Sequence, residues 1–248
     1  MEANLIEPAY RNLCAEWTGR SAADRAQLLD RFKVVYSYNS GHIENPEITF
    51  HDTAEVFDKG GVSNFTGDVR TIYEMNNLKR SWEWLMEAVA AKRQIDVESL
   101  LRAHELLTAG TYDDERWAKG ERPGTFKQGD YRVANDVGFV PEAVEEAVVS
   151  LLDQVRDAMA EPTRGQNALT IAAFAHARLV EVHPFADGNG RTARLLMNHI
   201  LLALDAPPCT IDADDRLAYF GALDCFHADG DLEPFKLFLM AQTLKTWK

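Results

Sequence analysis

The chain has 248 residues, of which 46% are hydrophobic and 26% are charged. This balance is close to the average of globular proteins and excludes a disordered, collagen-like or coiled-coil chain. A chain of this length buries roughly 70–75% of the surface that its unfolded form exposes. One hydrophobic core is therefore enough to stabilise it.

The net charge is −13, from 26 basic and 39 acidic residues. A surface with this excess of carboxylates repels the phosphate backbone of nucleic acids. We therefore expect no nucleic-acid partner. A polyphosphate ligand would need a local cluster of basic side chains and backbone N–H groups.

The cysteines and the hydrophobic runs indicate where the protein works. The three cysteines, Cys14, Cys209 and Cys225, have no regular spacing, which is typical of small core residues in a reducing compartment. The N-terminus is acidic, whereas a signal peptide begins with basic residues. The most apolar run, 195–203, is far shorter than the ~18–20 residues of a membrane span. We expect a soluble, cytoplasmic protein with no membrane partner.

Apolar residues at helical spacing predict an all-α chain. Ser21 with Asp24 resembles a capping box ahead of the first helix, Asp96 is a predicted N-cap, and Pro141 suits the first position of a helix. The expected helices, in chain order, cover residues 22–38, 68–93, 97–109, 141–160, 167–182, 189–204, 213–227 and 232–247.

One stretch breaks the helical pattern. Residues 122–140 contain three glycines, Pro123 and alternating apolar residues, which predicts a β-hairpin or an extended flap on the helical body. There is no internal repeat and no Pro- or Ser-rich linker. We therefore expect a main domain over 51–248, packed as one unit with a helical extension over 1–50.

The segment His183–Arg194, HPFADGNGRTAR, concentrates chemically capable residues between two predicted helices. His183 is a proton acceptor near neutral pH, and the Asp187 carboxylate suits a hard divalent cation. Gly188 and Gly190 allow backbone N–H groups to converge on an anion at the start of a helix. Arg191 and Arg194 lie one turn apart, and arginine binds phosphate in a fork.

Part of this segment also fits another motif. Residues 188–193 match the pattern G-x-G-x-x-A of dinucleotide-binding folds, which requires a preceding strand within a βαβ unit. The residues before it are alanine-rich with helical spacing, and no set of parallel strands is predicted elsewhere. The pattern therefore does not indicate a Rossmann fold.

The segment 183–194 resembles the signature HPFx[D/E]GNGRxxR of the Fic (filamentation induced by cAMP) family at every fixed position. The similarity extends over roughly 50–247. It implies an all-α Fic fold with one β-hairpin flap, and transfer of AMP from ATP, with Mg²⁺, to a hydroxyl of a target protein. The resemblance implies that His183 is the general base, Asp187 holds Mg²⁺, Phe185 anchors the loop, and the nucleotide phosphates bind to Gly188, Asn189, Gly190, Arg191 and Arg194.

A second pattern is similar to the inhibitory motif of this family, [S/T]xxxE[G/N]. Ser40, Glu44 and Asn45 fit it, and the resemblance implies that Glu44 reaches Arg194 and competes with the γ-phosphate of ATP. The alternative interpretation is a simple helix end with Glu44 in solvent.

The flap and an aromatic pair match the family less closely. Two registers fit the flap, Gly124-Thr-Phe126-Lys127 and Gly129-Asp-Tyr131-Arg132. We prefer the first, although Lys127 stands where arginine is usual. The resemblance implies that a target protein docks along this flap. Tyr219 and Phe220 look like the pair that lines the adenine, with helix packing as the alternative. The remaining histidines show no ligand spacing with acidic or cysteine partners.

The sequence therefore predicts an autoinhibited protein adenylyltransferase that uses ATP and Mg²⁺. Two alternatives remain: a Fic-fold enzyme that removes AMP or uses another nucleotide, and a nucleotide-binding interaction protein without activity. The presence of His183 disfavours the second. The target is open, and a homo-oligomer is compatible with the sequence.

Overall fold

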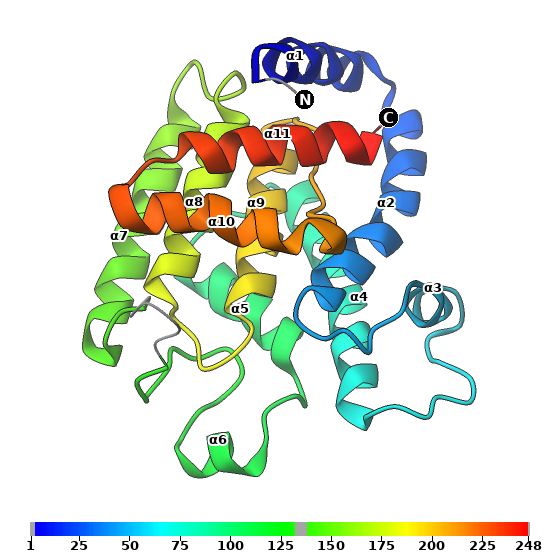
Figure 1. Cartoon of the computed structure of the whole chain (residues 1–248), viewed down its shortest axis with the longest axis vertical. Coiled ribbons are helices and arrows are strands. Elements are labelled where there is room, and N and C mark those ends of the chain that lie inside the picture. The colour runs from blue at the N-terminus through cyan, green and yellow to red at the C-terminus, as the bar shows by residue number, and fades with distance from the viewer. Residues whose placement is uncertain (1–2, 132–137, 248) are drawn as a thin grey trace.

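The computed structural model describes residues 3–131 and 138–247, and within these ranges it consists of helices and turns without a strand. Figure 1 shows the arrangement. The elements are α1 (Ala3–Gly19), α2 (Ala22–His42), α3 (Phe50–Lys59), α4 (Val69–Ala90), α5 (Val97–Thr108), α6 (Asp114–Ala118), α7 (Pro141–Ala160), α8 (Ala168–Val182), α9 (Asn189–Ala203), the 3₁₀ helix η2 (Ala213–Asp215), α10 (Arg216–Asp229) and α11 (Glu233–Trp247). The prediction of an all-helical body is confirmed.

The predicted helix starts coincide with local capping contacts. The Ser21 hydroxyl accepts a hydrogen bond from the backbone N–H of Asp24 at 3.1 Å. Asp96 and Ser99 form a reciprocal capping box at the start of α5. Pro141 is the first residue of α7, where its missing N–H costs nothing. These caps satisfy backbone donors that have no partner inside a helix.

Three helices were not among those expected. The first, α1, contains Pro8 in its interior and lacks charged residues of the favourable sign in its first and last turns. The others, α3 and α6, have 10 and 5 residues, too few for a clear helical period. The helix expected over 213–227 begins instead as η2 and continues as α10 to Asp229.

The core surrounds α8 and α9, which pack against each other at the centre of the molecule. In Figure 1 the orange and red helices α10 and α11 lie across this pair, and α7 flanks α8. Ten of the 15 residues of α8 are buried, as expected for a helix that is apolar on nearly every side. The loop between α8 and α9 is thereby anchored at both ends.

A separate cluster of aromatic side chains fixes α2 against this core. Phe32 and Tyr36 of α2 pack on Trp82 of α4, with ring centroids 5.3 and 5.1 Å apart. Trp247 of α11 lies 5.3 Å from Phe32 and 5.0 Å from Trp17 of α1. Because α2 is held on two sides, its C-terminal end lies in a defined place beside α9.

The predicted β-hairpin is not present in the described residues. Residues 122–131 and 138–140 contain no strand, and the middle of the predicted hairpin, 132–137, lies outside the described residues. Two backbone bonds hold the segment to the loop after α8, because Lys127 N–H donates to Pro184 O at 2.9 Å and Phe139 N–H donates to Val182 O at 3.0 Å. These bonds flank His183 in sequence.

The cysteines differ in burial. All three are free, and Cys209 is buried while Cys14 and Cys225 are partly exposed. The expectation of three core residues is therefore correct for Cys209 only. Among residues 3–131 and 138–247, none of the helices combines the length and the apolar character that crossing a membrane requires.

Candidate active site

The loop that follows α8 has a strained backbone at His183. This residue ends the helix in the left-handed region, with φ 51° and ψ 59°. A residue with a Cβ adopts this conformation at a cost, and such strain clusters at functional sites. Phe185 supplies an anchor: it is fully buried, and its ring stacks on His104 with centroids 3.7 Å apart.

Asn189 closes this loop with two hydrogen bonds to one residue. Its Oδ1 accepts from Phe185 N–H at 2.9 Å, and its Nδ2 donates to Phe185 O at 2.8 Å. The side chain is buried and therefore shapes the loop, so that only its backbone N–H is left for the predicted role in phosphate binding.

The two glycines of the motif are required for different reasons. Gly188 has φ 79°, and a Cβ there would lie 2.6 Å from Thr108 Cγ2. A Cβ on Gly190 would lie 2.5 Å from Glu44 Oε1 and 3.0 Å from Arg194 Nη1. The Glu44 carboxylate therefore lies directly against the first turn of α9. Backbone N–H groups in a first helical turn have no partner within the helix and attract anions.

Arg194 is the most deeply enclosed charge at the site. Its side chain is 1% exposed, and its Nε and Nη2 donate to Ser40 Oγ and Ser40 O at 3.0 and 2.9 Å. Nη2 also donates to Glu44 Oε1 at 2.8 Å. Burial opposes the charged form, but Glu44 outweighs it and raises the pKa of Arg194. Glu44 reaches Arg194 as the sequence pattern predicts, while 37% of the Glu44 side chain remains exposed.

Nη1 of Arg194 is buried and has no hydrogen-bond partner in the described part of the chain. A buried guanidinium N–H without an acceptor is costly. This nitrogen lies beside Gly190, at the helix start where the sequence predicts phosphate oxygens.

The other end of the motif holds a square of two carboxylates and two guanidinium groups. Asp187 accepts from Arg70 Nη2 at 2.8 Å and from Arg191 Nη2 at 3.2 Å. Glu74 accepts from Arg70 Nε at 3.0 Å and lies 3.6 Å from Arg191 Nη1. Burial alone would raise the pKa of Asp187, but Arg191 and Arg70 outweigh it and the pKa is lowered. The carboxylate is therefore ionised at pH 7.

Asn45 connects residues 40–45 to this square of charges. Its Nδ2 donates to Glu74 Oε2 at 2.7 Å and to Thr71 Oγ1 at 3.1 Å. The three residues of the predicted inhibitory motif thus contact both ends of the active-site segment, Ser40 and Glu44 directly and Asn45 through Glu74.

His183 has the protonation state that a general base needs. Burial, followed by the positive charge of Lys127, lowers its pKa to about 4. The imidazole is therefore neutral at pH 7 and able to accept a proton. The Lys127 side chain is itself 2% exposed, so the preferred flap register brings Lys127 into the interior close to His183.

His104 on α5 joins the active-site loop to the flap. Its Nε2 lies 3.0 Å from Asp187 O, and its Nδ1 accepts from Gly124 N–H at 3.0 Å. Burial lowers its pKa to about 4, so the ring is neutral and donates from Nε2. Phe126 packs near Phe185, with centroids 6.0 Å apart. Gly124 and Phe126 thus contact the same aromatic stack.

The aromatic pair of α10 divides between core and surface. Tyr219 is 1% exposed and its hydroxyl lies 3.1 Å from His176 Nε2, whereas Phe220 is 38% exposed. Arg216 lies over the Phe220 ring, with its Cζ 5.0 Å from the centroid. The helix-packing alternative therefore describes Tyr219, and Phe220 has the exposed face.

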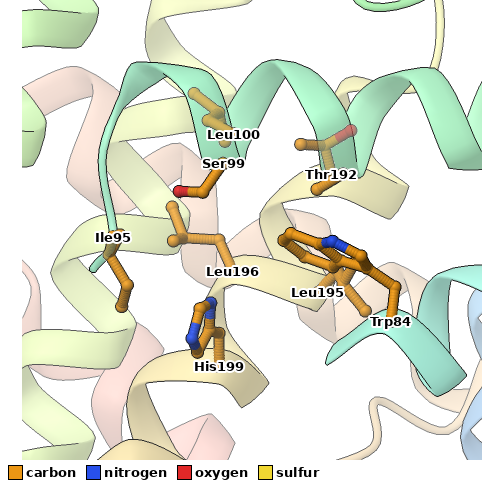
Figure 2. A pocket seen from close by; sticks show the side chains of 9 residues that line it. Trp84, Ile95, Ser99, Leu100, Thr192, Leu195, Leu196 and His199 are labelled. Carbon is orange, nitrogen blue, oxygen red and sulfur yellow. The ribbon is translucent and has the colours of Figure 1, made fainter. Parts of the chain in front are cut away.

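A mainly apolar pocket lies between α4, α5 and α9 (Figure 2). Trp84, Thr192 and His199 contribute to its wall together with aliphatic side chains. Its volume of about 10 Å³ is that of a single water molecule. The pocket shares α9 with the motif but is too small for a nucleotide.

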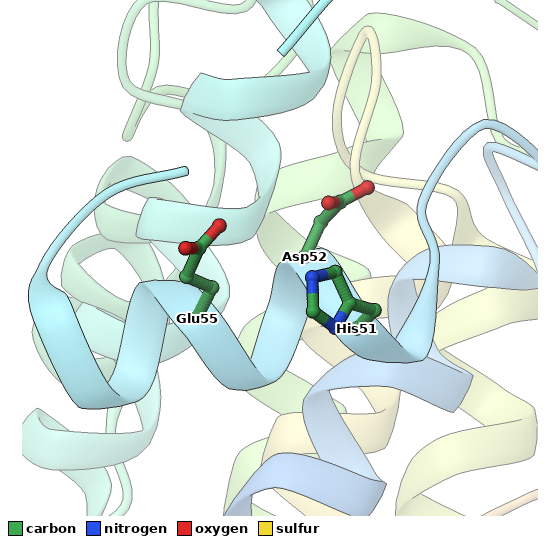
Figure 3. A group of neighbouring side chains, drawn as sticks. All are labelled: His51, Asp52 and Glu55. Atoms are coloured by element: carbon green, nitrogen blue, oxygen red, sulfur yellow. The ribbon is translucent and has the colours of Figure 1, made fainter. Parts of the chain in front are cut away.

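Within residues 3–131 and 138–247, a group of side chains on α3 also has metal-ligand chemistry. His51, Asp52 and Glu55 on α3 have ligand atoms within 4.8 Å of one another (Figure 3). The expectation that the remaining histidines lack acidic neighbours is therefore wrong for His51. Thr49 is the N-cap of α3 and its hydroxyl donates to the Asp52 carboxylate at 2.8 Å, while Glu55 accepts from Lys59 at 2.6 Å. Both carboxylates thus have structural roles.

Three polar residues that contact the motif were not predicted. Arg70, Glu74 and His104 come from α4 and α5, and each reaches the 183–194 segment only through folding. In the sequence, Arg70 and Glu74 have the i, i+4 spacing of an ion pair, and such a pair normally indicates a helix surface.

The chain is similar in sequence to known proteins. Residues 94–201 match the model of the Fic/DOC family. This match includes the whole of the 183–194 segment. It is 28% identical, over 203 residues, to the protein adenylyltransferase fic-1 of Caenorhabditis briggsae, covering 81% of this chain and 38% of that protein. It is also 28% identical to the protein adenylyltransferase Fic of Drosophila persimilis, with 91% and 42% covered. The chain spans less than half the length of these curated relatives.

Solved structures confirm the Fic fold. Fic-1 from C. elegans superposes with a TM-score of 0.82 at 23% identity, covering 98% of this chain and 69% of that one. A Fic family protein from Desulfovibrio desulfuricans superposes with a TM-score of 0.72 at 26% identity, over 96% and 73% of the two chains.

Proposed function

We propose that this chain is a protein adenylyltransferase that moves AMP from ATP to a hydroxyl side chain of a target protein. The observation that carries the proposal is the arrangement of His183, Asp187 and Arg194 around the first turn of α9, beside the glycines 188 and 190. Relatives with the name protein adenylyltransferase support the same activity.

The phosphates would bind at the start of α9. The N–H groups of residues 188–190 and the helix dipole favour an anion there. Arg191 and Arg194 are almost fully buried, and a guanidinium in such a site interacts with phosphate far more strongly than in water. The charge that develops on the leaving pyrophosphate would be met by groups already in position.

His183 would act as the general base. The hydroxyl oxygen of the target attacks the α-phosphorus, the bond from that phosphorus to the bridging oxygen breaks, and pyrophosphate leaves with the electron pair. The neutral imidazole takes the hydroxyl proton. The depressed pKa of about 4 keeps His183 unprotonated at pH 7.

Asp187 would hold the metal. Mg²⁺ commonly binds one or two carboxylates and takes its other ligands from phosphates and water. Asp187 fits this role because it is ionised, partly exposed at 22%, and adjacent to the anion-binding turn. When bound, Mg²⁺ neutralises phosphate charge in this kind of reaction.

Residues 40–45 would hold the enzyme in an inhibited state. The contact of Glu44 Oε1 with Arg194 at 2.8 Å engages the side chain that the distal phosphate would otherwise bind. Glu44 also fills space against Gly190. ATP would bind productively only when Glu44 leaves. Residues 1–50 would thus be a regulatory extension on a Fic domain over 51–248.

The target protein and the adenine would bind to different elements of the fold, the flap and α10. We assign the target to the flap, with Gly124, Phe126 and Lys127 as its first residues, because this segment bonds to the loop that carries His183. We assign the adenine to α10 near Tyr219 and Phe220, where Phe220 has an exposed ring.

The test is labelling with ATP that carries the radioactive phosphate at the α-position. Wild type, Glu44→Gly and His183→Ala would be incubated with Mg²⁺ and a cell lysate, and labelled peptides identified by mass spectrometry. We expect AMP on hydroxyl residues with Glu44→Gly and none with His183→Ala. Parallel reactions with GTP and UTP, and with a pre-adenylylated protein, detect another nucleotide or AMP removal instead.

A further inference from the structure

We propose that Arg70 is a resident cation on Asp187, which a divalent metal must replace before nucleotide is bound for reaction. The inference rests on the proposed function, because it concerns the metal position of that site. It begins with the 2.8 Å contact between Arg70 Nη2 and Asp187 Oδ2.

The two oxygens of Asp187 are engaged differently. Oδ1 accepts from the backbone N–H of Gly188 at 2.6 Å and from Arg191 Nη2 at 3.2 Å. Oδ2 accepts only from Arg70 among the described contacts. The bonds to Oδ1 belong to the active-site loop and to α9 itself. Oδ2 is therefore the oxygen at which an incoming cation can replace a partner of Asp187, and that partner is Arg70.

Burial identifies Arg70 as the arginine that moves. The Arg191 side chain is 3% exposed, whereas that of Arg70 is 38% exposed. A buried guanidinium that loses its carboxylate leaves an unpaired charge in the interior, but a partly exposed one exchanges its partner for water at little cost. Displacement of Arg70 is thus the less costly way to open the site.

Glu74 keeps Arg70 in place. Its Oε1 accepts from Arg70 Nε at 3.0 Å, and the Glu74 side chain is 5% exposed. Asn45 in turn donates to Glu74 Oε2 at 2.7 Å. The guanidinium of Arg70 therefore bridges two carboxylates, one fixed by Asn45 and the other in the active-site loop. Inhibition would act at two points of the phosphate site, through Glu44 on Arg194 and through Asn45, Glu74 and Arg70 on Asp187.

The exchange is a competition between like charges. A guanidinium within hydrogen-bond distance of the ligand oxygen repels an incoming divalent cation, even when it does not block every lone pair. Removal of Arg70 also leaves Asp187 and Glu74 with only Arg191 between them. Both effects raise the affinity for a hard cation that prefers oxygen ligands.

The experiment measures binding of Mn²⁺ alone to the whole chain, without nucleotide, from the electron paramagnetic resonance signal of the free ion. Variants are Arg70→Gln, Arg70→Lys, and Arg70→Gln combined with Asp187→Asn. Arg80→Gln is the matched control, because Arg80 is exposed on the same helix and lies ten residues, or about 15 Å, along it from Arg70. Circular dichroism melting verifies that each variant is folded.

We expect Arg70→Gln to bind Mn²⁺ about tenfold more tightly than wild type, because a like charge is removed from the ligand oxygen. Arg70→Lys and Arg80→Gln should remain close to wild type. The double variant should lose the gain, which would assign it to Asp187. Equal Mn²⁺ affinity in Arg70→Gln and wild type, or a gain that survives Asp187→Asn, overturns the proposal. Tighter Mn²⁺ binding without any AMP transfer would overturn the proposed function instead.

Discussion

Two arginine–carboxylate contacts hold the active-site segment, one at Arg194 and one at Asp187, and they differ in whether the guanidinium or the carboxylate is the more buried partner. In the first contact the buried partner is Arg194 of the motif, and it is paired with Glu44, whose side chain is 37% exposed. In the second contact Asp187 of the motif is paired with Arg70, which is 38% exposed. In each pair the partner from outside the motif is the accessible one.

This difference indicates which contacts can exchange with a ligand. A buried charge must always have a partner, so Arg194 will bind either Glu44 or a phosphate, with no intermediate state in water. An exposed guanidinium has the solvent as an alternative. We therefore expect Arg194 to exchange Glu44 for a phosphate in a single step. At Asp187 we expect Arg70 and a metal ion to compete in a graded way.

The largest expected effect is the loss of AMP transfer when the predicted general base is removed. His183→Ala should lower transfer by about 10²–10⁴-fold, the usual contribution of a general base. Nucleotide binding should be largely retained, because the phosphates contact the glycine turn and the arginines. Filter assays of transfer and calorimetry with ATP separate the two. Unchanged transfer in His183→Ala would refute the mechanism.

The next effect concerns the Arg194 end. Glu44→Gly should raise transfer roughly a hundredfold if the two nucleotide arrangements differ by about 3 kcal/mol. Glu47→Gly is the matched control, since Glu47 lies in the same turn and is exposed. Adding Arg194→Ala should remove most of the gain. Equal labelling by Glu44→Gly and wild type would mean that residues 40–45 form only a helix end.

Acid acts on two buried histidines, His104, which contacts Asp187, and His199, which lines the small pocket beside α9. His104 and His199 have pKa values lowered to about 4 by burial, from 6.5. The unfolded chain therefore binds protons between pH 6.5 and 4 that the folded chain does not, and stability falls as the pH is lowered through this range. At pH 5 each of these two histidines lowers the free energy of unfolding by up to about 2 kcal/mol relative to pH 7. Urea midpoints at pH 7 and 5 measure this, and His199→Gln should reduce the difference between them. Identical midpoints would contradict it.

The smallest expected effect compares the stability of the two contacts directly. Glu44→Gln should destabilise the fold by about 1–2 kcal/mol, because a neutral amide replaces the carboxylate that balances the buried charge of Arg194. Arg70→Gln should change the stability by less than about 1 kcal/mol, as for exposed pairs. Urea unfolding at pH 7 gives both values. Equal losses of stability in the two variants would show that burial does not distinguish the Glu44–Arg194 pair from the Arg70–Asp187 pair.

The sequence was sufficient for the helical body and for the contact between Glu44 and Arg194. Asp96 as an N-cap and Pro141 as a first helical residue favour helix starts locally. The contact between Glu44 and Arg194 was implied by the resemblance of residues 40–45 to the inhibitory motif. The roles of individual residues within 183–194, including Asp187 and the glycines, stay predictions.

The surrounding residues could not be predicted because packing selects them. Arg70 contacts Asp187 across 117 residues, and His104 contacts it across 83. Nothing near His104 in sequence indicates that its ring will stack on Phe185. Asn189 shows the converse: the motif identified the residue, but only the folded loop reveals that its side chain bonds to Phe185.

The contact between α2 and α9 has a consequence for the order of events during folding. Arg194 finds Ser40 across 154 residues, and Asn39 accepts a hydrogen bond from Ala213 N–H across 174. Loop closure over such distances is entropically costly and slow relative to helix formation. On the ribosome α2 emerges long before α9, so it must wait for its partner. We expect the contact between Arg194 and Ser40 to form late, in the same step in which the 183–194 segment packs against the N-terminal helices.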